Sequence, residues 1–124
     1  MKRILVIDDE ADIREIAQAS LEITTAWEVM TAASGEEGVA IAVSAQPDAI
    51  LLDVSMPGVD GVAASRQLRQ NSATCHIPVI FLTAQSEAAE RSVYEAMGGT
   101  AVVMKPFDPG TLAAQIKRAL AWTD

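Results

Sequence analysis

The fold of this 124-residue chain follows from residues 49–58, which read Ala49-Ile50-Leu51-Leu52-Asp53-Val54-Ser55-Met56-Pro57-Gly58. A short apolar run without a polar break, followed by a Met-Pro-Gly turn, is typical of a strand buried on both faces of a parallel sheet. Asp53 therefore stands where this strand meets its loop. In open α/β sheets ligands bind beyond the carboxyl ends of the strands, so its carboxylate is a candidate site group.

Four more strands are predicted from apolar runs at residues 4–7, 27–31, 78–82 and 101–104. Three of them end in residues that carry chemistry. These residues are Asp8-Asp9-Glu10 after the first run, Thr83-Ala84 after the third and Lys105-Pro106 after the fourth. Because the carboxyl ends of parallel strands meet at one edge of a sheet, we expect these side chains to converge on Asp53.

Five helices are expected between and after the strands, because apolar residues recur there at helical spacing. They are predicted over residues 11–24, 35–46, 61–70, 86–97 and from 109 onward. Ser34 and Asp108 are the expected N-caps of the second and last helices, and Gly98-Gly99 is expected to close the fourth. This alternation predicts a doubly wound α/β fold, with helices on both faces of a five-stranded parallel sheet. No internal repeat or linker divides the chain, so a single domain over residues 1–124 is expected.

The composition disfavours several classes of function. The formal net charge of −8 disfavours direct binding to nucleic acid, which relies on Lys and Arg at phosphates. No apolar stretch approaches the roughly 18 residues that span a bilayer, and the N-terminus lacks a signal-peptide pattern. We therefore expect a cytoplasmic protein that does not insert into a membrane. The single cysteine, Cys75, lacks metal-ligand spacing and is expected to be a buried or half-buried structural thiol.

Three carboxylates, a hydroxyl and an ammonium are thus expected at one edge of the sheet: Asp8, Asp9, Asp53, Thr83 and Lys105. Carboxylates this close repel one another unless they share a cation. Mg²⁺ prefers oxygen ligands and leaves positions for phosphate oxygens, which a lysine and a hydroxyl also bind. The set therefore points to phosphoryl transfer with Asp53 as nucleophile. For Asp8 and Asp9 taken alone, capping of the next helix is the alternative.

Four motifs in this order resemble those of receiver domains, the response regulators of two-component signalling. They are Ile7-Asp8-Asp9-Glu10, Leu52-Asp53-Val54-Ser55-Met56-Pro57-Gly58-Val59-Asp60-Gly61, Leu82-Thr83-Ala84 and Lys105-Pro106-Phe107. The resemblance covers the whole chain, and the motifs are specific together although each alone is weak. It implies a flavodoxin-like sheet of order 2-1-3-4-5. It also implies a stand-alone receiver domain over residues 1–124, similar to the chemotaxis proteins of the family.

By this resemblance, Asp53 would accept a phosphoryl group from a histidine kinase or a phosphotransfer protein. Asp9 would bind Mg²⁺ directly and Asp8 largely through water, and the Asp53 carboxylate and the backbone carbonyl of Ser55 would be further ligands. The chain would be a signalling switch rather than an enzyme, assisting only its own phosphorylation and dephosphorylation. Its signal would pass to a separate downstream protein, and a monomer or weak dimer is expected.

The resemblance also indicates which residues would respond to phosphorylation. Thr83, with Ala84 beside it, would move to hydrogen-bond the phosphoryl oxygens, and Lys105 would pair with them, its direction fixed by a cis Lys105-Pro106 peptide. Many family members carry Tyr or Phe three residues before the lysine, where this chain has Val102. We therefore expect the change to be passed on through the loop after Thr83 and the helix that follows it.

Two other functions are alternatives. Phosphatases of the haloacid dehalogenase type also use a strand-end Asp with Mg²⁺, but they carry a second Asp two residues later, where this chain has Ser55. A scaffold that binds partners without phosphorylation is compatible with Val102 but is disfavoured by the intact acidic site. Turnover of a phosphate ester would identify the phosphatase. Partner binding that is indifferent to Asp53→Asn would identify the scaffold.

Overall fold

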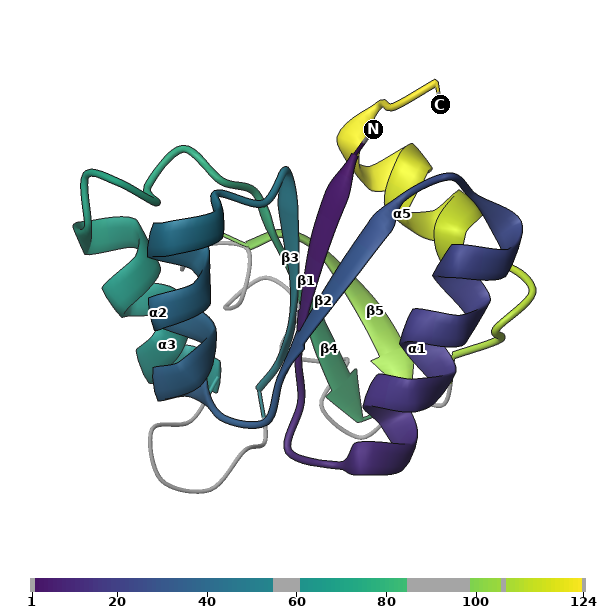
Figure 1. The fold of residues 1–124 in the computed structure, drawn as a ribbon, viewed down its shortest axis with the longest axis horizontal. Coiled ribbons are helices and arrows are strands. Elements are labelled where there is room, and N and C mark those ends of the chain that lie inside the picture. Colours follow the sequence, from purple (N-terminus) through teal and green to yellow (C-terminus); the bar gives the residue numbers. More distant parts are fainter. Residues whose placement is uncertain (1, 55–60, 85–98, 106, 124) are drawn as a thin grey trace.

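The computed structural model describes residues 2–54, 61–84, 99–105 and 107–123 of the chain. Figure 1 shows a central sheet with helices layered on both of its faces. The elements are β1 (Arg3–Ile7), α1 (Ala11–Thr24), β2 (Glu28–Ala32), α2 (Gly35–Ala45), β3 (Ala49–Asp53), α3 (Gly61–Gln70), β4 (Val79–Ala84), β5 (Gly99–Lys105) and α5 (Leu112–Leu120). The helix predicted over residues 86–97 lies outside the described residues.

The five strands are all parallel and follow the order β2-β1-β3-β4-β5. The predicted sheet is therefore confirmed. The strand order reverses between β1 and β3, and a crevice opens at such a point beyond the carboxyl ends of the strands. In the register of this pair Ile7 lies beside Leu52, so Asp8 and Asp53 follow at the same level of the sheet.

Each face of the sheet contributes to its own hydrophobic core. Ile4 and Val6 pack in the core under α1 and α5, whereas Leu5 and Ile7 pack in the core under α2 and α3. Successive side chains of a strand point to opposite faces, so a strand covered on both sides needs apolar residues at every position. All five residues of β3 are buried, which is why its sequence shows an unbroken apolar run.

The N-cap prediction is confirmed for α2 and wrong for α5. The Oγ of Ser34 accepts a hydrogen bond from the backbone N–H of Glu37 at 3.1 Å. The last helix begins after Thr111, not after Asp108. Asp108 instead closes a turn, because its Oδ1 accepts from Gly110 N at 2.8 Å and its carbonyl accepts from Thr111 N at 3.0 Å. An Asp-Pro-Gly sequence favours such a turn over a helix start.

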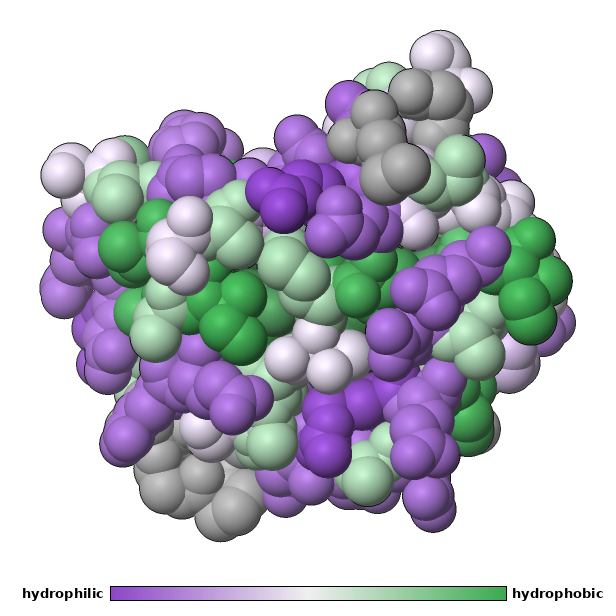
Figure 2. All heavy atoms as spheres, viewed as in Figure 1, coloured by the Kyte–Doolittle hydropathy of each residue, from purple (hydrophilic) through white to green (hydrophobic). Residues whose placement is uncertain are grey.

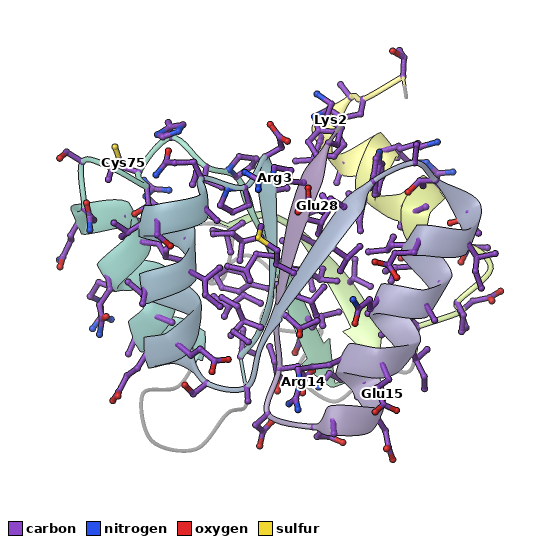
Figure 3. The ribbon with its side chains drawn as sticks, in the orientation of Figure 1. Lys2, Arg3, Arg14, Glu15, Glu28 and Cys75 are labelled. Carbon is purple, nitrogen blue, oxygen red and sulfur yellow. The ribbon has the colours of Figure 1, made fainter. Side chains whose placement is uncertain are left out.

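One smaller expectation is untested and another is corrected. Gly99 is the first residue of β5, but Gly98 and the fourth helix lie outside the described residues, so closure of that helix by the two glycines stays a prediction. Cys75 is an exposed free thiol rather than a buried one, and Figure 3 shows it on the outer side of the segment after α3. That segment is polar and lies at the surface, so the thiol is not covered by the core.

Helix α2 approaches β1 closely at Gly38, which is buried against Ile7. A Cβ placed on Gly38 would lie 2.7 Å from Cγ1 and 3.2 Å from Cγ2 of Ile7, and closer still to its Cδ1. Real Cβ atoms essentially never come within 3.0 Å of another heavy atom. The contact between this helix and the sheet therefore depends on a residue without a side chain.

At the opposite edge from Asp53, the start of β1 and the end of α5 lie side by side (Figure 1). Trp27 packs edge-on against Trp122, with ring centroids 5.4 Å apart, and the Nζ of Lys2 lies 4.6 Å from the centroid of the Trp122 ring. The cation–π contact thus joins the two ends of the described chain, and the aromatic contact adds the segment between α1 and β2. Among the described helices, none is long and apolar enough to cross a membrane.

Candidate functional site

Four strands deliver polar side chains to the carboxyl edge of the sheet. Asp8 follows β1, Asp53 ends β3, Thr83 is the penultimate residue of β4 and Lys105 ends β5. Asp8, Asp53 and Thr83 are at most 1% exposed, although each carries a polar side chain. Buried polar groups cost free energy unless they are paired, so these side chains need partners within the protein.

Lys105 is the centre of this arrangement. Its Nζ lies 2.9 Å from Oδ2 of Asp8, 3.4 Å from Oδ1 of Asp53 and 3.7 Å from Oε1 of Glu10. The two aspartate side chains are at most 2% exposed and the lysine side chain is 16% exposed. One ammonium thus serves two buried carboxylates and one exposed carboxylate.

The balance of effects on the lysine favours its charged form. Burial lowers the pKa of Lys105, but the hydrogen bond and the negative charge of Asp8, together with those of Asp53, outweigh burial. The pKa of Lys105 is consequently raised above its ordinary value of 10.5. The ammonium is therefore charged at neutral pH, while the carboxylates around it outnumber it.

The acidic turn after β1 offers a group of oxygen ligands. Carboxylate oxygens of Asp8, Asp9 and Glu10 all lie within 4.8 Å of one another. The turn is held in shape because Oδ1 of Asp8 accepts from Glu10 N at 2.9 Å and Asp8 N donates to Ala32 O at 3.1 Å. Hard oxygen donors grouped on one turn fit a cation such as Mg²⁺.

Side-chain capping, the alternative role for the Asp pair, does not account for the turn. The N-cap of α1 is Glu10, and no side-chain cap hydrogen bond is made there. Asp9 is exposed and makes no hydrogen bond or ion pair with the described residues. In Figure 2 hydrophilic side chains gather at the lower edge of the molecule, below α1, where the chain leaves β1.

The structure brings most of the predicted site residues together. Asp8 and Asp53 both contact Lys105, and Asp9 lies in the acidic turn, although Asp53 is not part of that oxygen group. The last residues of the two edge strands pair, since Ala84 lies beside Lys105 in the register of β4 and β5.

The structure leaves two parts of the site prediction untested and shows the surroundings of a third residue, Val102. Ser55 and Pro106 lie outside the described residues, so the expected carbonyl ligand and the expected cis peptide stay predictions. Val102 is half-buried and packs against the core under α2 and α3.

Two residues near the site were not among the predicted site residues. Glu10, the last residue of the first sequence motif, belongs to the oxygen group and contacts Lys105. Arg14 lies within the helix predicted over residues 11–24, and no role in the site was predicted for it. Its Nη1 donates to the backbone carbonyl of Asp8 at 2.8 Å, and Figure 3 shows it at the foot of α1 near the end of β1. Helical periodicity gives no signal for such a contact, because it does not describe the reach of a long side chain.

Comparisons with known proteins agree with this geometry. The family model of the response regulator receiver domain matches residues 4–117. The chain is 41% identical over 123 residues to the probable transcriptional regulator ycf27 of Cyanophora paradoxa. It is 37% identical over 122 residues to the phosphate regulon transcriptional regulatory protein PhoB of Pseudomonas aeruginosa. These matches cover 99% and 98% of this chain but 50% and 53% of the relatives, so the chain spans about half their length.

Solved structures give the same result. The chemotaxis protein CheY4 of Vibrio cholerae is similar with a TM-score of 0.88 at 33% identity, over 96% of this chain and 98% of that one. A response regulator from Desulfuromonas acetoxidans is similar with a TM-score of 0.87 at 27% identity, over the whole of both chains.

Proposed function

The chain belongs to the response regulator receiver domains, and we propose that it is a phosphoacceptor whose acceptor group is the carboxylate of Asp53. The observation that carries the proposal is the position of Lys105, whose Nζ lies 3.4 Å from Oδ1 of Asp53 in a buried site. An ammonium held there can neutralise the charge that develops on a phosphoryl group as it arrives. The donor is a histidine kinase or a phosphotransfer protein, which presents a phosphohistidine.

In the proposed reaction an oxygen of the Asp53 carboxylate attacks phosphorus as the bond from phosphorus to the donor nitrogen breaks. The donor imidazole leaves with that electron pair, and the phosphoryl group remains on Asp53. Lys105 stays charged and pairs with the new phosphoryl oxygens, which its raised pKa supports. The hydroxyl of Thr83, buried at the end of the neighbouring strand, is the proposed donor to another of these oxygens.

Asp8 and Asp9 are the residues that would hold Mg²⁺, with the carbonyl of Ser55 as a further proposed ligand. The fit rests on the clustered carboxylate oxygens of the acidic turn, which are the ligand type that this ion prefers. When bound, Mg²⁺ supplies positive charge for the phosphoryl oxygens. Asp8 is shared between this role and its ion pair with Lys105, so the same carboxylate links the two halves of the site.

Phosphorylation is proposed to act as a switch rather than as a step in turnover. The added charge draws Thr83 and Lys105 toward Asp53 and shifts the surface near β4 and β5 between two states. A separate protein that prefers the shifted surface then receives the signal. The relatives named above are called transcriptional regulators, and we propose that this domain contributes phosphorylation-dependent control and leaves nucleic-acid contact to other parts or partners. It assists only its own phosphorylation and dephosphorylation.

The test is phosphorylation by acetyl phosphate with and without Mg²⁺, followed by intact-mass measurement. We expect one phosphoryl adduct that requires Mg²⁺ and is absent from Asp53→Asn. The matched control is Asp12→Asn, which makes the same chemical change at an exposed position in the first turn of α1 and is expected to keep the adduct. An adduct on Asp53→Asn, or none on a folded wild-type protein that binds Mg²⁺, would refute the proposal. Release of phosphate from esters without an adduct would favour a phosphatase.

A further inference from the structure

Asp8 is fully buried, and each of its polar groups has a partner of its own. Its N–H donates to Ala32 O at 3.1 Å and its Oδ1 accepts from Glu10 N at 2.9 Å. Its Oδ2 lies 2.9 Å from Nζ of Lys105. The carbonyl oxygen accepts from Nη1 of Arg14 at 2.8 Å. Arg14 is thus the residue that satisfies the backbone acceptor of the most buried acid in the site.

Arg14 holds the acidic turn at both of its ends. Its side chain binds the carbonyl of Asp8, and its backbone N–H donates to the carbonyl of Glu10 at 3.1 Å. The three oxygen-bearing residues 8–10 lie between these two hydrogen bonds. Arg14 itself is half-buried in the first turns of α1, whereas its neighbour Glu15 is exposed.

We propose that Arg14 is a positioning residue of the cation site, acting through the backbone of Asp8. It fixes the turn so that the carboxylates of Asp8 and Asp9 stay within reach of one ion. This inference rests on the proposed function, because it takes the acidic turn to be the Mg²⁺ site. Residues that orient metal ligands from outside commonly change metal affinity by about 10- to 100-fold when they are replaced.

The charge of Arg14 has the opposite effect, which makes the proposal testable by sign. A guanidinium beside the turn repels a divalent cation, so its removal alone would strengthen Mg²⁺ binding. Loss of the hydrogen bond to Asp8 frees the turn and weakens binding. If positioning dominates, Arg14→Met binds Mg²⁺ more weakly than wild type. If Arg14 is only a nearby positive charge, the same variant binds Mg²⁺ more tightly.

The experiment measures Mg²⁺ affinity by isothermal titration calorimetry on the unphosphorylated protein. We expect about a tenfold loss for Arg14→Met, at the low end of the range for indirect contacts. Arg14→Lys keeps the charge and one donor and is expected to recover most of the affinity. The matched control Arg66→Met makes the same change at an exposed position of α3 and is expected to bind Mg²⁺ as wild type does. An affinity of Arg14→Met equal to or tighter than that of wild type would overturn the proposal.

A second measurement separates positioning of the cation from a general loss of structure. With acetyl phosphate, Arg14→Met is expected to gain its adduct slowly at limiting Mg²⁺ and at the wild-type rate at saturating Mg²⁺. A rate that stays low at saturation would overturn the inference. If Arg14→Met does not fold, Arg14→Gln takes its place. Weaker Mg²⁺ binding by Arg14→Gln than by wild type would support the inference, and equal or tighter binding would overturn it. A wild-type protein that binds Mg²⁺ but forms no adduct would refute the proposed function instead.

Discussion

Replacing Gly38 by alanine tests how closely α2 is packed on the sheet. The new methyl group would lie 2.7 Å from Cγ1 and 3.2 Å from Cγ2 of Ile7, where carbons prefer about 3.5 to 4.0 Å. Ile7 is fully buried, so it has little space in which to move away. Overpacking of a core costs about 1–3 kcal/mol. Because the carbon–carbon distances here are well below the preferred range, we place the cost of Gly38→Ala at the upper end of this interval. The higher helix propensity of alanine returns about 1 kcal/mol. We therefore expect a net loss of about 2 kcal/mol in the free energy of unfolding.

The assay is urea unfolding followed by circular dichroism, in which the midpoint should fall while the slope stays unchanged. A double-mutant cycle with Ile7→Val identifies the clash, because valine lacks the Cδ1 atom that lies nearest to the new methyl group. Gly38→Ala should cost less in the Ile7→Val background than in wild type. A Gly38→Ala protein as stable as wild type, or equal costs in the two backgrounds, would refute the packing argument.

Two further predictions concern buried polar groups. Ser65 is fully buried on α3, and its Oγ has no hydrogen-bond partner within the described part of the chain. Because a buried hydroxyl without a partner costs free energy, Ser65→Ala is expected to raise the free energy of unfolding, measured by urea titration, by about 1 kcal/mol. Lys105→Met should lower it by about 3 kcal/mol at pH 7, since Asp8 and Asp53 lose their shared cation. Because the folded-state pKa of Lys105 is raised above 10.5, its contribution is complete below that pH and lost as pH rises through the folded-state value. Unfolding curves of the wild-type protein across alkaline pH should show this loss of stability, whereas those of Lys105→Met should not. A destabilising Ser65→Ala, or a neutral Lys105→Met, would contradict the assignment of these groups.

The sequence predicts those parts of the fold in which a strand is buried on both faces of the sheet. The unbroken apolar runs of β1 and β3 indicated a covered parallel sheet, and the polar residue after each run indicated the edge where the site lies. Ser34 was predictable as a cap because its hydrogen bond to Glu37 N is local in sequence. The order of the strands came from the resemblance, since hydrophobic patterning does not say which strands pair.

The failures have a common physical origin in interactions that compete with a local pattern. Asp108 has the residue type of an N-cap, but the glycine two residues later makes a turn more favourable, and the helix starts after Thr111. The contact between Trp27 and Trp122 joins the segment before β2 to the segment after α5, and each ring alone gives no sign of its partner. Cys75 was expected to be buried or half-buried, whereas its polar surface segment leaves the thiol exposed.

Burial explains why Asp8 could be predicted as a site residue while its support by Arg14 could not. An acid placed at the end of a buried strand is visible in the sequence. The same burial removes water from the backbone of Asp8, so its carbonyl needs a partner from the protein, and only the folded geometry selects Arg14 for that contact. Lys105 is the charged partner that the buried carboxylates of Asp8 and Asp53 need, and it lies on β5, the strand farthest from β2 in the sheet. The chemistry of this edge therefore depends on two cations with different tasks. Lys105 offsets the buried charge directly, whereas Arg14 holds the turn that carries it.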